Sequence, residues 1–174
     1  KPSWENYIPI EGDKVIQLDP GMAFGTGTHE TTVLCLELLE KYVKDNSSVI
    51  DMGTGSGILA LAASLLGSSR VVGIDKDETA VKIAAENVIL NNLSSSVAVR
   101  KGDRIGVAGI KADIIVANIV ADVIIDISRH VPPFLKDGGI FIASGIIRER
   151  KLSVTEALER NGFDIIDEAE KGEW

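Results

Sequence analysis

Cysteine and histidine are scarce in this chain. Cys35 is the only cysteine, so the chain can form neither an internal disulfide framework nor a thiolate metal cluster. His29 and His130 are the only histidines, which argues against a histidine-based metal site. No apolar run reaches the roughly 18 residues typical of a membrane span, and the first residues lack the apolar segment of a signal peptide. We expect no metal, no membrane association and a cytoplasmic location.

Basic residues are fewer than acidic ones. Lys and Arg number 18 against 26 Asp and Glu, which gives a net charge of -8 and a pI near 4.8. Binding to phosphate backbones requires clustered Lys and Arg, so we expect no direct nucleic-acid partner. The length of 174 residues and 45% hydrophobic content suit one full-sized core, and we expect a monomer. The chain does not begin with Met and stops after a strand-like segment, so we expect a fragment of a longer protein.

Short apolar runs alternate with helical patterns along most of the chain. Runs that are apolar throughout, each followed by a helix, predict a parallel sheet covered on both faces. Right-handed crossovers then give an α/β, doubly wound, Rossmann-like fold that binds ligands at the carboxyl ends of its strands. The predicted strands cover 48–52, 70–74, 96–100, 112–117, 139–143 and 163–166. The predicted helices cover 29–44, 57–66, the stretch capped by Asp77, 119–131 (with Val120, Val123, Ile124 and Ile127 inward) and 148–161. The first twenty residues read as two extended segments separated by a turn at Gly12-Asp13.

The sequence "VIDMGTGSG", residues 49–57, joins a predicted strand to a predicted helix. Gly53, Gly55 and Gly57 would let a ligand approach the backbone closely. A dinucleotide fingerprint requires a further glycine where this chain has Ile58. The pattern D-x-G-x-G-x-G therefore favours a ligand that is not held by a pyrophosphate. The alternative is a tight strand-to-helix turn that binds nothing.

Three polar residues follow other predicted strands. Asp75 lies about twenty residues beyond the glycine loop, where a carboxylate can accept hydrogen bonds from both ribose hydroxyls; the alternative is a helix-capping or solvated Asp. Asn118 would point its amide at the ligand or at the incoming nucleophile, or it is a turn residue. Asp103 is either an adenine contact or part of a surface turn.

The stretch "DPGMAFGTGTHETT", residues 19–32, has a composition that a plain connector does not require. It lacks the Lys of a phosphate-binding loop, and His29 has no second metal ligand nearby. We favour His29 as a residue of the helix start over a general base. Thr31 and Thr32 would then present hydroxyls to a ligand carboxylate near the helix N-terminus. Phe24, among glycines, either covers a flat ring or anchors the loop on the core.

These motifs together carry a family resemblance. The glycine loop with Asp75 resembles class I S-adenosylmethionine-dependent methyltransferases. The stretches "LDPGMAFGTGTHETT", "VIDMGTGSGILAL", "VGIDKD", "VANIVADV" and "ASGII", in this order, look like the methyltransferase family of large-subunit ribosomal protein eleven. The resemblance runs from about Trp4 to Trp174.

The resemblance implies transfer of methyl groups from S-adenosylmethionine to lysine side-chain amines and the N-terminal amine of that ribosomal protein. It implies a loop around Phe24 and Gly25 that closes over the cofactor. No general base is evident, so no catalytic residue is assigned, and Asn118 is the preferred orienting group. The remaining expected cofactor contacts are Thr32, Gly53, Gly55, Asp75 and Asn118.

The resemblance also divides the chain. Residues 1–28 would be an N-terminal extended segment and cofactor-covering loop, and residues 29–174 the S-adenosylmethionine-binding catalytic domain. The family's N-terminal substrate-recognition domain has no counterpart here, and its closing strand would follow Trp174. Thr54 stands where relatives often have Cys, and we expect it to matter little.

Three other functions stay open at this point. Another class I methyltransferase would act on a different amine; residues 118–121 lack the N-P-P-Y of enzymes that methylate planar nitrogens, which favours an amine target. A nicotinamide-dependent oxidoreductase is opposed by Ile58 and by the lack of a Tyr-x-x-x-Lys pair. A non-catalytic binding module that only keeps the fold is the third.

Overall fold

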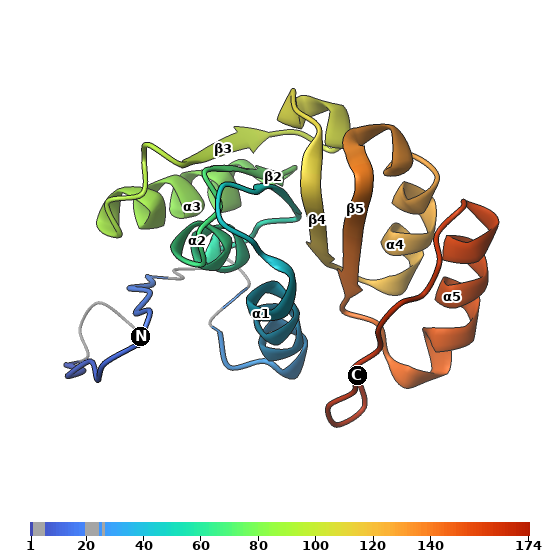
Figure 1. Cartoon of the computed structure of the whole chain (residues 1–174), viewed down its shortest axis with the longest axis horizontal. Coiled ribbons are helices and arrows are strands. Elements are labelled where there is room, and N and C mark those ends of the chain that lie inside the picture. The colour runs from blue at the N-terminus through green and yellow to red at the C-terminus, as the bar shows by residue number, and fades with distance from the viewer. Residues whose placement is uncertain (2–5, 20–24, 26) are drawn as a thin grey trace.

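The computed structural model describes residues 1, 6–19, 25 and 27–174. In these residues five parallel strands form one sheet in the order β3-β2-β1-β4-β5, which confirms the predicted doubly wound α/β fold (Figure 1). The strands are β1 (Ser48–Met52), β2 (Arg70–Asp75), β3 (Val97–Lys101), β4 (Ala112–Asn118) and β5 (Leu135–Ser144). The α-helices are α1 (Glu30–Tyr42), α2 (Ile58–Leu65), α3 (Glu78–Leu90), α4 (Ala121–Ser128) and α5 (Lys151–Arg160). None of the helices in this described part is long and apolar enough to cross a membrane.

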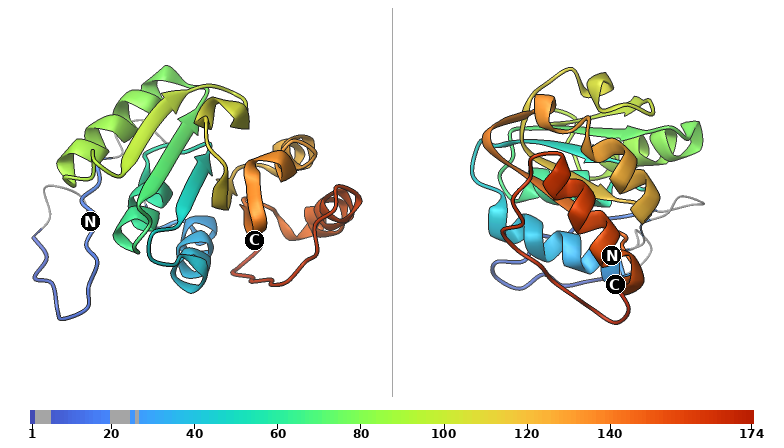
Figure 2. Two further views of the ribbon diagram at one scale, coloured as in Figure 1. Left: turned by 45° about the horizontal axis from the view of Figure 1, so that its top comes forward. Right: turned by 90° about the vertical axis from the view of Figure 1, so that its right-hand side faces the viewer.

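The sheet lies between two layers of helices (Figure 2). Successive residues of β1 point to opposite faces, as the pleat of a strand requires. Val49 belongs to the cluster beneath α1, α2 and α3, which includes Leu39 and Leu61, and Ile50 belongs to the cluster beneath α4 and α5, which includes Ile124. Val49, Ile50 and Met52 of β1 are all buried, which explains why its apolar residues do not alternate with exposed polar ones. The two polar residues of this strand, Ser48 and Asp51, are buried as well.

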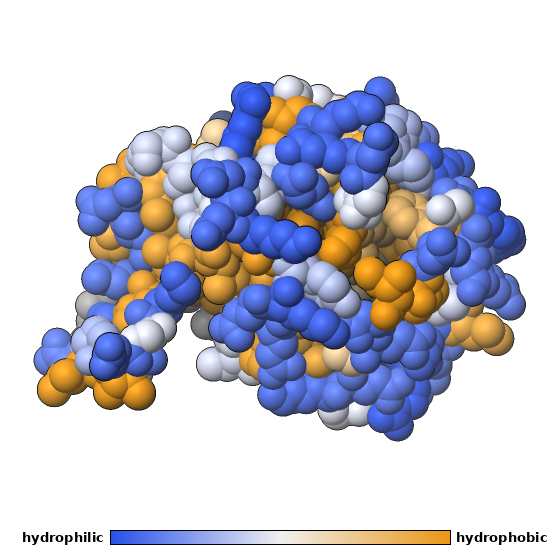
Figure 3. All heavy atoms as spheres, in the orientation of Figure 1, coloured by the Kyte–Doolittle hydropathy of each residue, from blue (hydrophilic) through white to orange (hydrophobic). Residues whose placement is uncertain are grey.

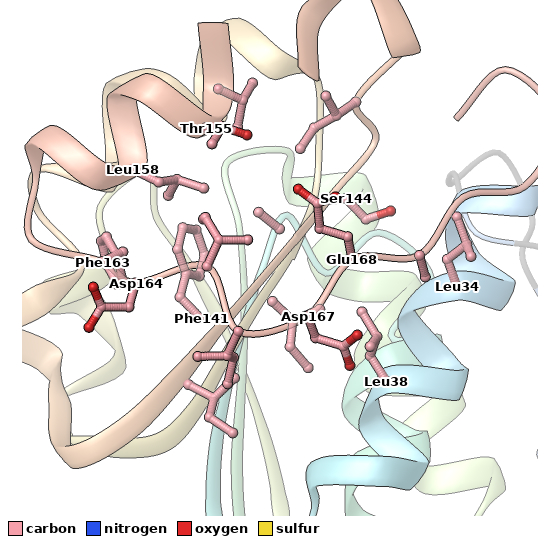
Figure 4. A pocket seen from close by; sticks show the side chains of 18 of the residues that line it. Leu34, Leu38, Phe141, Ser144, Thr155, Leu158, Phe163, Asp164, Asp167 and Glu168 are labelled. Atoms are coloured by element: carbon pink, nitrogen blue, oxygen red, sulfur yellow. The ribbon is translucent and has the colours of Figure 1, made fainter. Parts of the chain in front are cut away.

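The predicted sixth strand is wrong. Residues 163–166 form no strand in the structure, and Ile166 is 67% exposed. A groove of about 620 Å³ lies between this segment and the outer edge of β5 (Figure 4). Phe141 of β5, Phe163, and Leu34 and Leu38 of α1 line it. The apolar side chains that suggested a strand instead line this groove. The pattern of apolar residues alone cannot distinguish such a segment from a strand that pairs with the sheet.

The predicted inward face of the fourth α-helix is half wrong. Val120 is 65% exposed and Val123 is 42% exposed, whereas Ile124 is fully buried. Val120 has extended backbone angles and precedes the helix, so it does not share the helical phase. The buried face runs through Ala121, Ile124 and Ser128, at spacings of three and four residues.

The N-terminal segment keeps its predicted turn but forms no strand within residues 6–19. The amide of Asp13 donates to the carbonyl of Ile10 at 3.1 Å, and the Asp13 carboxylate accepts from the hydroxyl of Tyr7. Ile8 is 88% exposed, and this segment forms the projection at the lower left of Figure 3. Leu18, only 3% exposed, joins the core and anchors the segment to the body of the domain.

Candidate functional site

The glycine loop follows β1 at the carboxyl edge of the sheet. Gly53, Gly55 and Gly57 have φ of 71°, 54° and 87°, a region that L side chains rarely adopt. The amide of Gly53 donates to the carbonyl of Ile74 at 2.8 Å, so the loop crosses the end of β2. A Cβ at Gly53 would lie 2.6 Å from the Ile119 side chain. Here both the conformation and the space require glycine.

Asp75 ends β2 beside this loop and receives two backbone amides. Its carboxylate accepts from Gly55 N and from Asp77 N, each at 3.0 Å. The first bond brings together two residues that the sequence predicted for one site. Asp77, not Asp75, caps α3 by accepting from Thr79 N at 2.8 Å, as the sequence predicted. The helix-capping role considered for Asp75 is therefore taken by its neighbour Asp77. The Asp75 carboxylate stays at the loop and can accept further hydrogen bonds.

Asn118 and Thr32 form the second pair of predicted residues that meet. The side-chain amide of Asn118, at the end of β4, donates to the hydroxyl of Thr32 in the first turn of α1 at 3.3 Å. The hydroxyl of Ser144, at the end of β5, donates to the carbonyl of Thr31 at 3.2 Å. These bonds tie the start of α1 to two strand ends. Thr32 is 1% exposed, so its hydroxyl is held in place.

His29 is the N-cap of α1, as the sequence favoured. Its Nδ1 accepts from the amide of Thr31 at 3.3 Å and lies 2.8 Å from the Thr31 hydroxyl. Its ring meets that of Trp174 edge to face, with centroids 5.2 Å apart. The imidazole thus satisfies one of the free amides of the helix start.

Thr54 makes a buried contact that the sequence did not predict. Its hydroxyl donates to Asp51 at 2.6 Å, and the amide of Ala60 donates to the same carboxylate oxygen at 3.1 Å. Burial raises the pKa of Asp51 to about 6, against these two hydrogen bonds, which lower it. The other oxygen of Asp51 has no hydrogen-bond partner among the described residues. Through these two hydrogen bonds, Asp51 links the glycine loop to the first turn of α2.

Gly25 also approaches the glycine loop. Its carbonyl accepts from the Ser56 hydroxyl at 2.6 Å, its φ is 105°, and an added Cβ would lie 2.7 Å from that hydroxyl oxygen. Phe24, the other predicted residue of this stretch, lies outside the described residues. Asp103 is exposed next to Arg104, as expected of a surface turn.

The site fits S-adenosylmethionine. The cofactor would lie along the backbone of the glycine loop, where Gly53, Gly55 and Gly57 carry no side chains. It carries two ribose hydroxyls, and the half-buried carboxylate of Asp75, beside the loop, could accept from them. It also carries an amino acid end, which the Asn118 amide, bonded to the Thr32 hydroxyl at the same edge, would help to hold.

Comparison with known proteins identifies the family. The model of the ribosomal protein L11 methyltransferase (PrmA) family matches residues 1–174. The chain belongs to the ribosomal protein L11 methyltransferase family. A protein of this name from Alkaliphilus oremlandii is 49% identical over the whole chain, and one from Acetivibrio thermocellus is 54% identical. The chain spans 56% and 55% of their lengths, about half of each relative.

Solved structures agree with this family assignment. The ribosomal protein L11 methylase from Lactobacillus delbrueckii superimposes with a TM-score of 0.92 at 37% identity, covering 99% of this chain and 89% of that one. The Bacillus subtilis tRNA methyltransferase TrmK superimposes with a TM-score of 0.65 at 22% identity, covering 76% of this chain and 57% of that chain. The second likeness shows the fold alone. The sequence resemblance to the L11 methyltransferase family is thus confirmed.

Proposed function

We propose that this chain binds S-adenosylmethionine at the carboxyl edge of its sheet and transfers methyl groups to amines of ribosomal protein L11. The observation that carries this proposal is the meeting of predicted residues in two pairs, Gly55 with Asp75 and Thr32 with Asn118, on either side of Gly53. Membership of the L11 methyltransferase family supports the choice of substrate. A ribosomal substrate also supports the expected cytoplasmic location.

The chain's own residues would bind and orient the reactants. Asp75 would accept from the ribose hydroxyls, and the glycine loop would lie along the cofactor. Phe24 and Gly25 belong to the segment proposed to cover it. When bound, the cofactor supplies an activated methyl group on its sulfonium. Holding an amine in line with that group and excluding water are the protein's main contributions to such a reaction.

The target amine has to lose its proton before it attacks, since a free lysine has a pKa near 10.4. Among the described residues, three titratable groups of this edge already have other partners. Asp51 lies buried beneath the loop, Asp75 accepts two backbone amides, and His29 caps α1. We therefore assign Asn118 an orienting role, with its amide oxygen directed to the amine, and assign no general base.

Binding and turnover test separate parts of this proposal. Calorimetric titration should give tight binding of S-adenosylhomocysteine and none of NAD. The reverse result would instead indicate a nicotinamide-dependent oxidoreductase. A methyl-transfer assay with L11 should then use a chain extended to the full length of the relatives. Binding without transfer by that longer chain would leave a non-catalytic module, and transfer only to other amines would indicate a different methyltransferase.

A further inference from the structure

Thr54, between two glycines of the loop, forms hydrogen bonds with all three of its polar groups. Its amide donates to the carbonyl of Ile74 at 3.0 Å, and its carbonyl accepts from the amide of Gly57 at 2.8 Å. Its hydroxyl donates to the buried carboxylate of Asp51 at 2.6 Å. The residue is 4% exposed, so these bonds are shielded from water.

The side chain of Thr54 restrains a stretch that is otherwise glycine. Gly53 and Gly55, on either side of it, have no side chain and have more backbone freedom than any other residue type. The Thr54 side chain packs against β2, where a Cβ added at Gly73 would lie 2.8 Å from the Thr54 hydroxyl oxygen. Gly73 thus leaves the space that Thr54 fills. The hydroxyl and this packing together fix the position of the loop.

The backbone amide that follows Thr54 binds the carboxylate of Asp75. Gly55 N donates to Oδ2 of Asp75 at 3.0 Å, and Asp77 N donates to Oδ1 at the same distance. The two amides belong to different segments, the glycine loop and the start of α3, and together they set the orientation of the carboxylate. The amide of Gly55 lies where the restraint on its neighbour Thr54 places it.

We propose that Thr54 is a positioning residue for cofactor binding, because its bond to Asp51 fixes the Gly55 amide and, through it, the orientation of the Asp75 carboxylate. This inference rests on the function proposed above, in which Asp75 accepts from the ribose hydroxyls. Thr54 does not need to touch the cofactor, since its hydroxyl is directed to the buried Asp51. Its effect is on the part of the affinity that comes from the ribose.

The test compares two ligands by calorimetric titration: S-adenosylhomocysteine and its analogue that lacks both ribose hydroxyls. Thr54→Val keeps the size of the side chain and removes the hydroxyl. We expect this variant to bind S-adenosylhomocysteine about fivefold more weakly, the scale of one net hydrogen bond. Its affinity for the analogue should equal that of the unaltered chain, because that ligand has no hydroxyl for Asp75. A merely structural role would weaken the binding of both ligands alike.

Two further substitutions at the same position test the hydroxyl itself. Thr54→Ser keeps the hydroxyl and should bind S-adenosylhomocysteine as the unaltered chain does. Thr54→Cys replaces it with a thiol, a weaker donor, and should show a smaller loss confined to the same ligand. Thermal melting measures the folded fraction of each variant, and Thr54→Cys takes the place of Thr54→Val if the latter does not fold.

Ser68→Ala is the matched control. It removes a buried hydroxyl that lies 3.0 Å from the Ser47 hydroxyl, before the start of β2 and so at the opposite edge of the sheet. This variant should change neither affinity, and a loss equal to that of Thr54→Val would overturn the inference.

Three other results would also overturn it: equal weakening for both ligands in Thr54→Val, no weakening for either, or a loss in Thr54→Ser as large as in Thr54→Val. Failure of the proposed function has a different signature, because the unaltered chain would then bind no S-adenosylhomocysteine. Equal binding of the two ligands by the unaltered chain would refute the ribose role of Asp75 and the inference with it.

Discussion

The side-chain amide of Asn118 reaches the hydroxyl of Thr32 across 86 residues of sequence, at 3.3 Å. This bond connects the end of β4 to the first turn of α1. It joins the "VANIVADV" stretch to the end of "DPGMAFGTGTHETT", two motifs that looked independent in the sequence. Because the two side chains support each other, their contributions to ligand binding should be coupled.

A double-mutant cycle measures that coupling. Asn118→Ala and Thr32→Val should each weaken S-adenosylhomocysteine binding, and the double variant should lose less than the sum. Residues in contact show interaction energies of about 0.5–3 kcal/mol. Calorimetric affinities of the four proteins provide the cycle, and strictly additive losses would contradict a shared role.

Asp75→Ala should weaken S-adenosylhomocysteine binding by at least about 100-fold. The variant removes an acceptor for the ribose hydroxyls and for Gly55 N, and hydrogen bonds to a charged group contribute about 1.5–3 kcal/mol each. Asp77→Ala is the control, two residues away: it removes the α3 cap and should cost about 1 kcal/mol of stability with no change in affinity. Wild-type affinity in Asp75→Ala would refute the ribose role.

Gly53→Ala should abolish cofactor binding and destabilise the fold. A non-glycine residue in the left-handed region costs roughly 1–2 kcal/mol, and the new Cβ would also press on Ile119. Gly138→Ala has the same backbone penalty, with φ of 70°, but no atom within 4 Å of its added Cβ. Urea unfolding of both variants separates the two costs; equal losses would show that the Ile119 contact is unimportant.

The buried carboxyl of Asp51 should make stability depend on pH. Its folded pKa, raised by burial to about 6, exceeds the ordinary value of 3.8, so the native state binds the proton more tightly. The contribution is present below about pH 4 and is lost as the pH rises through 6, a change of about 3 kcal/mol. Asp51→Asn should lack this change. Urea unfolding at pH 4.5 and 7.5 compares the two proteins, and parallel pH profiles would contradict the assignment.

Cys35 should report global unfolding. Its thiol is fully buried, and burial raises its pKa to about 12, so the reactive thiolate is scarce in the native state. As the only cysteine, it should react with a thiol reagent at pH 8 only as fast as the domain opens. Labelling rates across urea concentrations should therefore follow unfolding rates measured by circular dichroism. Rapid labelling of the native protein would contradict this burial.

Much of this architecture is predictable from local patterns. The central strand β4 has a continuous run of buried apolar residues at 114–117, and Asp77 marks the start of α3 by an N-cap that the structure reproduces. The rule that parallel strands gather functional groups at their carboxyl ends correctly placed Asp75 at the same edge as the glycine loop, where Gly55 meets it. The bond from Asn118 to Thr32 of α1 was not predicted.

The errors have a common origin in contacts that local sequence does not encode. The Asn87 side chain accepts a hydrogen bond from the amide of Asp19, 68 residues away, and no local motif predicts this contact. The bond of Thr54 to Asp51 was not predicted, because the sequence does not show that Asp51 is buried. Residues 163–166 are apolar because they line a groove, and a strand would have the same composition.

The groove beside β5 bears on how copies of this chain behave at high concentration. Among the described residues, β5 borders the sheet, so its outer edge offers backbone groups to any extended segment that enters. The net charge of -8 keeps copies apart at low ionic strength. Salt screens that repulsion but leaves the edge unchanged. Self-association of this domain should therefore increase with ionic strength, through edge-to-edge strand addition at β5.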